Sequence, residues 1–131
     1  MRRILVASVL AITITGLLAG PAFASKPSSR AGTSSIALES YSVLQLGGTV
    51  GFATNAVGLA GWEYPMVALD CYQNGSLVYI ELNTPSHEFM LGGTSSTWLS
   101  NGGAAHCIAS LDAYGKQSVR TLATTEFDAA G

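Results

Sequence analysis

Charged residues are scarce in this chain, and basic residues are the scarcest among them. Asp, Glu, Lys and Arg together make up only 11% of the 131 residues. Beyond residue 24, eight acidic side chains face only four basic ones, a formal net charge of −4 for that part. Those basic residues are Lys26, Arg30, Lys116 and Arg120. Nucleic acids and anionic membrane surfaces are bound by clustered Lys and Arg, so the composition excludes both as partners.

Cysteine is almost absent as well, since only Cys71 and Cys107 are present. No third cysteine competes for pairing, and in an exported protein two such residues predict a disulfide rather than a redox pair. The alternative is two free thiols at a metal, but further ligands at metal spacing are lacking. On the chain-entropy account, closing this loop would constrain the unfolded chain by roughly 4 kcal/mol.

The chain has a single long hydrophobic run, and it lies at the N-terminus. Met1-Arg2-Arg3 is followed by an uncharged segment, 4–18, and then by the small-x-small site Ala22-Phe23-Ala24. This pattern predicts a secretory signal peptide over 1–24, cleaved after Ala24. The run is shorter than the roughly 20 residues that span a bilayer, so no membrane span is expected after cleavage. A twin-arginine signal is the less favoured route, because no polar residue precedes the arginine pair.

The rest of the chain divides into two parts. Residues 25–35 contain no large apolar side chain and predict a flexible N-terminal segment. Residues 36–131 show no helical periodicity, and their alternating segments, separated by Gly and Asn, predict one all-β domain of about seven strands. The expected strands cover 36–46, 49–54, 66–73, 76–82, 88–91, 104–111 and 119–127. A β-sandwich fits this pattern best, with a small barrel as the alternative.

The best-defined element is a hairpin centred on Asn74-Gly75, a pair typical of two-residue turns. The turn predicts a register in which Cys71 faces Val78 and Asp70 faces Tyr79. In that register one set of side chains points to the core: Val67, Leu69, Cys71, Val78, Ile80 and Leu82. The opposite set points outward: Asp70, Tyr72, Tyr79 and Glu81.

Cysteines on an early and a late strand resemble the arrangement in immunoglobulin-type domains. The segments 68–73, 89–93, 103–107 and 127–129 also resemble small secreted actinobacterial proteins that have no assigned function. The resemblance implies an immunoglobulin-like sandwich from a secreted bacterial protein. Cys107 is then expected to come from the facing sheet, which makes the bridge to Cys71 an inter-sheet disulfide.

No residue pattern predicts catalysis. The two histidines, His87 and His106, are the only candidates for a general base at neutral pH. His106 is expected to point outward from one sheet and Asp70 outward from the other, so the two cannot pair. His87 and Glu88 are adjacent on an extended chain and point to opposite sides, which does not favour a metal site. We therefore predict a non-enzymatic protein without cofactor or metal.

Exposed aromatic residues are the best candidates for a function. A binding patch is predicted from five side chains that could stack on sugar rings or anchor a protein: Trp62, Tyr64, Tyr72, Tyr79 and Trp98. The alternative is structural, with the tryptophans capping the sandwich and the tyrosines covering its sheets.

The leading hypothesis is a secreted, envelope-associated binding domain whose partner is a cell-wall glycan or an envelope protein. Two other functions are kept open. One is a subunit that assembles through strand edges, suggested by the irregular strand 36–46. The other is a secreted hydrolase or its inhibitor, acting through His106.

Overall fold

The protein is described by a computed structural model over residues 32–94 and 96–131. The predicted signal peptide, residues 1–24, and residues 25–31 lie outside the described residues. The described part contains seven strands and no helix. The strands are β1 (Ser35–Tyr41), β2 (Thr49–Asn55), β3 (Tyr64–Gln73), β4 (Ser76–Asn83), β5 (Phe89–Met90), β6 (Ala105–Tyr114) and β7 (Val119–Ala129). The predicted all-β class is therefore confirmed.

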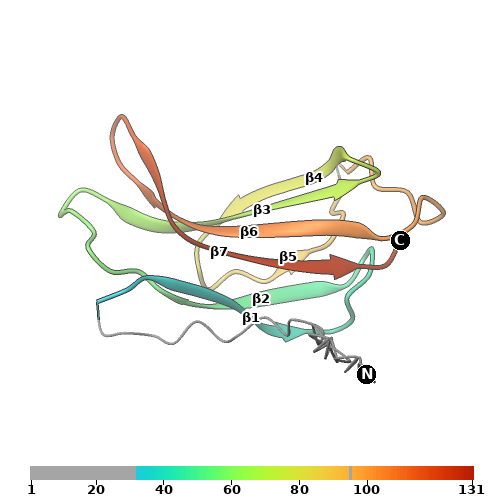
Figure 1. The fold of residues 1–131 in the computed structure, drawn as a ribbon, viewed down its shortest axis with the longest axis horizontal. Coiled ribbons are helices and arrows are strands. Elements are labelled where there is room, and N and C mark those ends of the chain that lie inside the picture. Colours follow the sequence, from blue (N-terminus) through green and yellow to red (C-terminus); the bar gives the residue numbers. More distant parts are fainter. Residues whose placement is uncertain (1–31, 95) are drawn as a thin grey trace, which may run out of the picture.

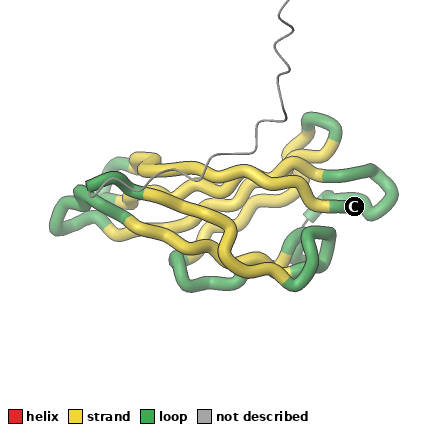
Figure 2. The backbone as a smooth tube through the Cα atoms, turned by 60° about the horizontal axis from the view of Figure 1, so that its bottom comes forward, coloured by secondary structure: helices red, strands yellow, loops and turns green. Residues whose placement is uncertain are grey.

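The strands form two sheets that face one another (Figure 1). One has the order β1-β2-β5 and the other the order β4-β3-β6-β7, and all their pairings are antiparallel. Loops gather at the two ends of this sandwich (Figure 2). The core between the sheets is apolar, and its fully buried larger side chains are Phe89, Leu69, Leu91, Leu111, Val50, Val67, Cys71 and Cys107.

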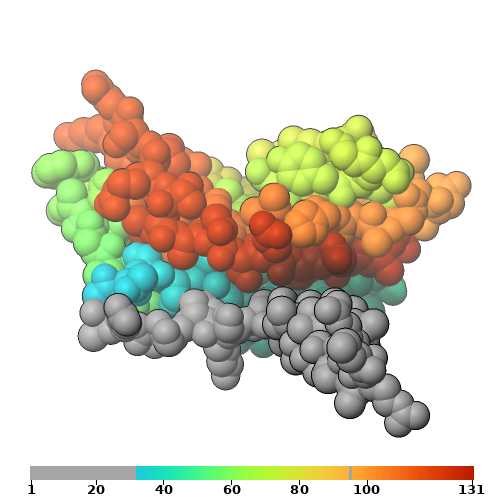
Figure 3. All heavy atoms as spheres, viewed as in Figure 1, coloured from blue at the N-terminus to red at the C-terminus, as the bar shows by residue number. Residues whose placement is uncertain are grey.

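One long side of the sandwich is closed by backbone contacts. β1 packs beside β7 (Figure 3). Beyond β1, the Leu46 amide donates to the Ala130 carbonyl at 2.8 Å, and the Ala130 amide donates to the Leu44 carbonyl at 2.9 Å. These bonds join the two sheets on the β7 side, so the edge of β7 is partly covered.

The β3–β4 hairpin turns where the sequence predicts. Asn74 and Gly75 both have positive φ, 52° and 80°, as the two-residue Asn-Gly turn requires. Tyr72 lies opposite Leu77, which confirms the predicted start of the register. One residue later the predicted register is wrong, because a β-bulge at Val78 shifts the pairing and sets Cys71 opposite Tyr79.

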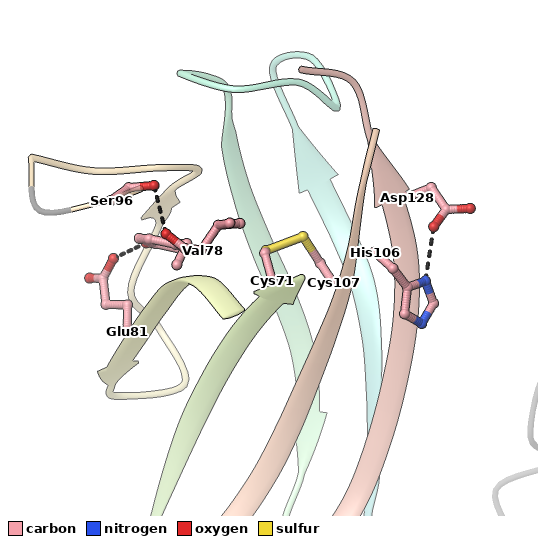
Figure 4. Close-up of a disulfide and its surroundings, with 8 residues drawn as sticks. Cys71, Val78, Glu81, Ser96, His106, Cys107 and Asp128 are labelled. Carbon is pink, nitrogen blue, oxygen red and sulfur yellow. Dashed lines mark hydrogen bonds and ion pairs between the residues drawn. A yellow bond between two sulfur atoms is a disulfide. The ribbon is translucent and has the colours of Figure 1, made fainter. Parts of the chain in front are cut away.

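Contacts far along the chain hold this bulge. The Val78 carbonyl accepts a hydrogen bond from the Ser96 hydroxyl at 2.9 Å (Figure 4). It also accepts one from the Thr97 amide at 2.9 Å. The shift reverses the faces of the following residues. Tyr79 is buried, whereas Ile80 and Leu82 are exposed, so the predicted orientations of all three are wrong.

The disulfide joins Cys71 to Cys107, as predicted (Figure 4). The expectation that it links the two sheets is wrong. β3 and β6 are neighbours in one sheet, and the two cysteines are direct partners in their antiparallel ladder. Both side chains point into the core, which is what the alternation of the sequence indicated. Alternation along a strand determines the face to which each side chain points. It does not determine which strand lies beside it.

Candidate binding site

The five predicted patch residues do not form one surface. Tyr79 is only 7% exposed and Trp98 only 6%, so both belong to the core. Their predicted outward placement is wrong. Tyr79 was turned inward by the bulge at Val78. Trp98 follows the loop that bonds to Val78, and its own amide donates to the Ser96 hydroxyl at 2.9 Å.

The remaining three aromatic residues lie at opposite ends of β3. Tyr64 begins the strand and is exposed, with Trp62 just before it at 67% exposure. Tyr72 lies near the other end of β3, opposite His106, and is half-buried. Trp62 and Tyr64 therefore lie at one end of β3, and most of the strand separates Tyr72 from them.

A further tyrosine extends this surface. Tyr64 and Tyr114 are partners on β3 and β6, and their ring centroids lie 6.1 Å apart. Trp62 lines a surface hollow together with three residues of the turn between β6 and β7, Lys116, Gln117 and Ser118. The surface made by these side chains is called the aromatic end: Trp62, Tyr64, Tyr114, Lys116, Gln117 and Ser118. Most of these residues belong to the 56–63 loop and the β6–β7 hairpin, which lie at the same end of the sandwich (Figure 1).

An ion pair fixes the loop that carries Trp62. The Arg120 guanidinium donates to the Glu63 carboxylate at 2.8 Å and to the Gly58 carbonyl at 3.1 Å. The same carboxylate oxygen accepts the Ala60 amide at 2.9 Å. The Ala60 hydrogen bond and then the Arg120 contact lower the pKa of Glu63, so its carboxylate stays charged and bonded at neutral pH. The aromatic end is therefore held in place before any ligand arrives.

Each histidine contacts carboxylates. His106 bonds through Nδ1 to Asp128 at 2.9 Å (Figure 4). Its Nε2 lies 3.2 Å from Glu126, and both carboxylates are on β7. The expectation that His106 and Asp70 point outward from different sheets is wrong, because β3 and β6 share a sheet and their outer faces look the same way. In the structure, the carboxylates that His106 contacts come instead from β7.

His87 contacts Glu81 at 3.0 Å, and the same carboxylate accepts the Tyr79 hydroxyl. Burial, followed by this bond to Glu81, raises the pKa of Tyr79, so its hydroxyl stays protonated and donates. Glu81 is thus directed toward the loop after β4 and not outward as predicted.

Across residues 32–94 and 96–131 there is no group of three or more His, Cys, Asp or Glu side chains placed to hold a metal.

Two polar residues that the sequence analysis missed are buried in this sheet. Gln73 fixes the 99–103 loop: its amide nitrogen donates to the carbonyls of Leu99 and Gly103, each at 2.8 Å, and its oxygen accepts the Leu99 amide at 3.1 Å. Asp112 is buried on β6, where the Ser110 hydroxyl donates to one of its oxygens at 3.0 Å. Neither residue has a local sequence signal, because each depends on a partner strand or loop.

Asp70 lies on the outer face of β3 with Asp112 near enough to influence it. Partial burial, and then the charge of Asp112, raises the pKa of Asp70. One oxygen of each carboxyl is buried and makes no hydrogen bond within the described chain.

No protein-family model, curated protein or solved structure gives a significant match to this chain. Over the described residues, no helix has the length and apolar character needed to cross a membrane.

Proposed function

We propose that this chain is a secreted, non-enzymatic bacterial domain with an immunoglobulin-like fold, and that its aromatic end binds a cell-wall glycan. The observation that carries the binding proposal is the exposed Trp62 ring, which lines a hollow together with the polar residues Lys116, Gln117 and Ser118.

Export is supported by the N-terminal sequence and by the disulfide. The basic start, the apolar run and the Ala22-Phe23-Ala24 site are typical of a signal peptide. A disulfide between Cys71 and Cys107 persists where the surroundings are oxidising, as outside the cytoplasm.

The immunoglobulin-like proposal rests on strand order. The sheets β1-β2-β5 and β4-β3-β6-β7 correspond to the orders A-B-E and C′-C-F-G of that fold. In this correspondence Cys71 lies on strand C and not on strand B, where antibody domains carry their first cysteine. The tight hairpin directly after Cys71 then fits, because C and C′ are adjacent strands of one sheet.

The chemistry of the aromatic end favours a carbohydrate. An exposed indole offers a flat apolar face to the C–H side of a sugar ring, at little cost in conformational freedom. Gln117 and Ser118 line the same hollow with amide and hydroxyl groups that can bond to sugar hydroxyls, and Lys116 adds a cation. Such a cation suits an acidic glycan of the cell wall.

The absence of catalysis is proposed from the contacts of the histidines. His106 is exposed between two carboxylates, and His87 contacts Glu81, which also bonds the Tyr79 hydroxyl. Among the described residues that bond to these histidines or to Glu81, the one hydroxyl is that of Tyr79, which is buried, donates to Glu81 and is not an activated nucleophile. If the protein were a hydrolase or its inhibitor acting through His106, the variant His106→Ala would abolish that effect.

The proposal is tested by co-sedimentation of the purified protein with insoluble cell wall from the organism that encodes it. We expect retention of the wild type and loss of at least about tenfold in affinity for Trp62→Ala, because stacking is removed. Tyr41→Ala is the matched control, since Tyr41 is an exposed aromatic residue on β1, away from this end. Trp98 is unsuitable for this purpose because it is buried.

Three outcomes contradict the proposal. Retention that Trp62→Ala leaves unchanged would place the binding surface elsewhere. Retention abolished by protease treatment of the wall, and not by glycan digestion, would replace the glycan with an envelope protein. No retention at any protein concentration would favour the structural alternative, in which Trp62 caps the sandwich and binds no ligand.

A further inference from the structure

The outer face of the β4-β3-β6-β7 sheet is turned away from β1 and β2 and carries acidic and apolar side chains in a regular order (Figure 1). Residues directly opposite each other in an antiparallel pair point to the same face of a sheet. The strand registers therefore set one row of side chains across the middle of this face: Ile80, Asp70, Ile108 and Glu126. In this row an isoleucine lies on each side of Asp70.

Asp70 is the central group of the row, and it has no ion pair within residues 32–94 and 96–131. One of its carboxyl oxygens is buried and accepts no hydrogen bond there. Burial, and then the charge of Asp112, raises the pKa of this carboxyl. A carboxylate that is partly withdrawn from water gains more from a cation than a fully hydrated one does.

Asp112 adds a second carboxylate to the same face. It has the outward parity on β6, four residues after Ile108, and is only 6% exposed. One of its oxygens accepts the Ser110 hydroxyl at 3.0 Å, and the other is buried without a partner in the described chain. Buried carboxylate oxygens in proteins are normally hydrogen-bonded or paired with a cation. Asp70 and Asp112 are therefore both incompletely satisfied within the described chain.

This face has no Lys or Arg side chain of its own. None of the outward positions on its four strands is basic, and the two basic residues of the described chain lie elsewhere. Arg120 is already in an ion pair at the aromatic end, and Lys116 lies in the β6–β7 turn. Among the described residues of the face, His106 is the one group that can take a positive charge near neutral pH, and it contacts Asp128 and Glu126. Charge complementarity therefore favours a positively charged partner.

We propose that this row is an interaction surface for a basic segment of a protein partner, with a Lys or Arg side chain of that partner lying between Ile80 and Ile108 and its charged group on Asp70. Lys and Arg suit this place because each carries its charge at the end of an apolar stem. The stem packs on the two isoleucines, of which Ile80 is 65% exposed, and the charged end bonds to the carboxylate. Glu126, two strands from Asp70 and so about 10 Å away, offers a second carboxylate to the same segment.

The shape of the surface favours a protein over a small cation. Asp70, Ile108 and Glu126 line neither the hollow beside Trp62 nor the larger hollow along β4. Small ligands are held in concave sites that bury most of their surface, whereas protein interfaces are broad and combine apolar groups with polar ones. The row is also separate from the aromatic end, so this proposal does not depend on glycan binding.

Isothermal titration calorimetry with a short peptide tests the proposal. The probe is acetyl-Lys-Leu-Lys-Leu-Lys-amide, and the acidic analogue acetyl-Glu-Leu-Glu-Leu-Glu-amide is the charge control. We expect only the basic peptide to bind. For Asp70→Asn, which keeps the size of the side chain, the dissociation constant should be at least about fivefold higher, because a partly buried charge pair is removed.

Glu39→Gln is the matched control variant. It removes the same charge from an exposed position on β1, in the other sheet, and should leave the dissociation constant within about twofold. Equal losses for Asp70→Asn and Glu39→Gln would show that the net charge alone attracts the peptide, and this result would overturn the proposal. The absence of any binding by the basic peptide would overturn it as well. Binding of cadaverine, a small diamine, as tightly as the peptide would overturn the assignment to a protein partner.

NMR titration of the wild type with the same peptide gives a test that needs no variant. The amide signals of Asp70, Ile80 and Ile108 should shift, while those of β1 stay unchanged. Shifts confined to the aromatic end or to β1 would overturn the proposal. Asp70→Asn should be retained on cell wall like the wild type, so a failure here is distinguishable from a failure of glycan binding.

Discussion

Cys71 and Cys107 lie directly opposite each other across the β3–β6 ladder, with their Cα atoms 4.0 Å apart. The covalent bond therefore reinforces two strands that already share hydrogen bonds, and it does not tie one sheet to the other. Apart from the backbone bonds of Leu44 and Leu46 to Ala130, the sheets are held together by side-chain packing, such as the contact of Phe52 on β2 with Phe127 on β7, whose ring centroids lie 6.2 Å apart.

The double variant Cys71→Ala/Cys107→Ala should lower the free energy of unfolding by roughly 3–4 kcal/mol, because the cross-link closes a loop in the unfolded chain. We expect it to fold with the strand pairing intact at low temperature. Urea denaturation of the oxidised wild type and the variant measures the difference. An equal stability of the two proteins would show that the link adds nothing to the ladder.

The position of the bridge shows what alternation can and cannot predict. The sequence placed Cys71 and Cys107 on inward faces, which is correct, but two inward cysteines can meet from facing sheets or from neighbouring strands. Likewise, the Asn74-Gly75 turn predicted the pairing of Tyr72 with Leu77. The bulge one residue later depends on the Thr97 amide and the Ser96 hydroxyl, which no local pattern places beside Val78.

The candidate site was partly predictable for the same reason. Trp62 and Tyr64 follow a glycine-containing loop, and such a loop favours exposure. Tyr79 and Trp98 look equally exposed in the sequence, yet one is turned inward by the bulge and the other by the loop that holds it. Their burial is a tertiary consequence that a strand pattern does not contain.

Substitution of the two tryptophans should have very different effects on the free energy of unfolding. Trp98→Ala should cost roughly 3–5 kcal/mol, since it leaves a large cavity in the core. Trp62→Ala should change the free energy of unfolding by no more than about 0.5 kcal/mol, because its ring is mostly in solvent. Chemical denaturation of both variants decides this. Similar losses for the two would mean that Trp62 packs against the domain and is not free to bind.

The Gln73 side chain is expected to be essential for the 99–103 loop. Gln73→Leu should lower stability by about 1–3 kcal/mol, because Leu99 and Gly103 would lose the three hydrogen bonds that the buried Gln73 side chain makes to them. Gln117→Leu, on an exposed loop, is the control and should be nearly neutral. Thermal unfolding compares the variants, and amide exchange at residues 99–103 should rise only for Gln73→Leu. Unchanged exchange in that loop would contradict this role.

His106 should make stability depend on pH near neutrality. The hydrogen bond to Asp128, and then the charges of Asp128 and Glu126, outweigh desolvation and raise the pKa of His106 above its ordinary value of 6.5. A raised pKa in the folded state means that the stabilisation is fully present below the unfolded pKa and is lost as pH rises through the folded one. The thermal midpoint of the wild type, relative to His106→Gln, should therefore fall as pH is raised above about 6.5.

The carboxylates that surround His106 provide a matched pair of variants for that prediction. Asp128→Asn should lower the pKa of His106 more than Glu126→Gln does, because Asp128 supplies the larger contribution. NMR titration of the His106 ring protons measures both shifts directly. If Glu126→Gln had the larger effect, the pKa of His106 would be set mainly by the Nε2 contact at 3.2 Å and not by the Nδ1 bond at 2.9 Å. A titration midpoint at or below 6.5 in the wild type would remove the expected pH dependence altogether.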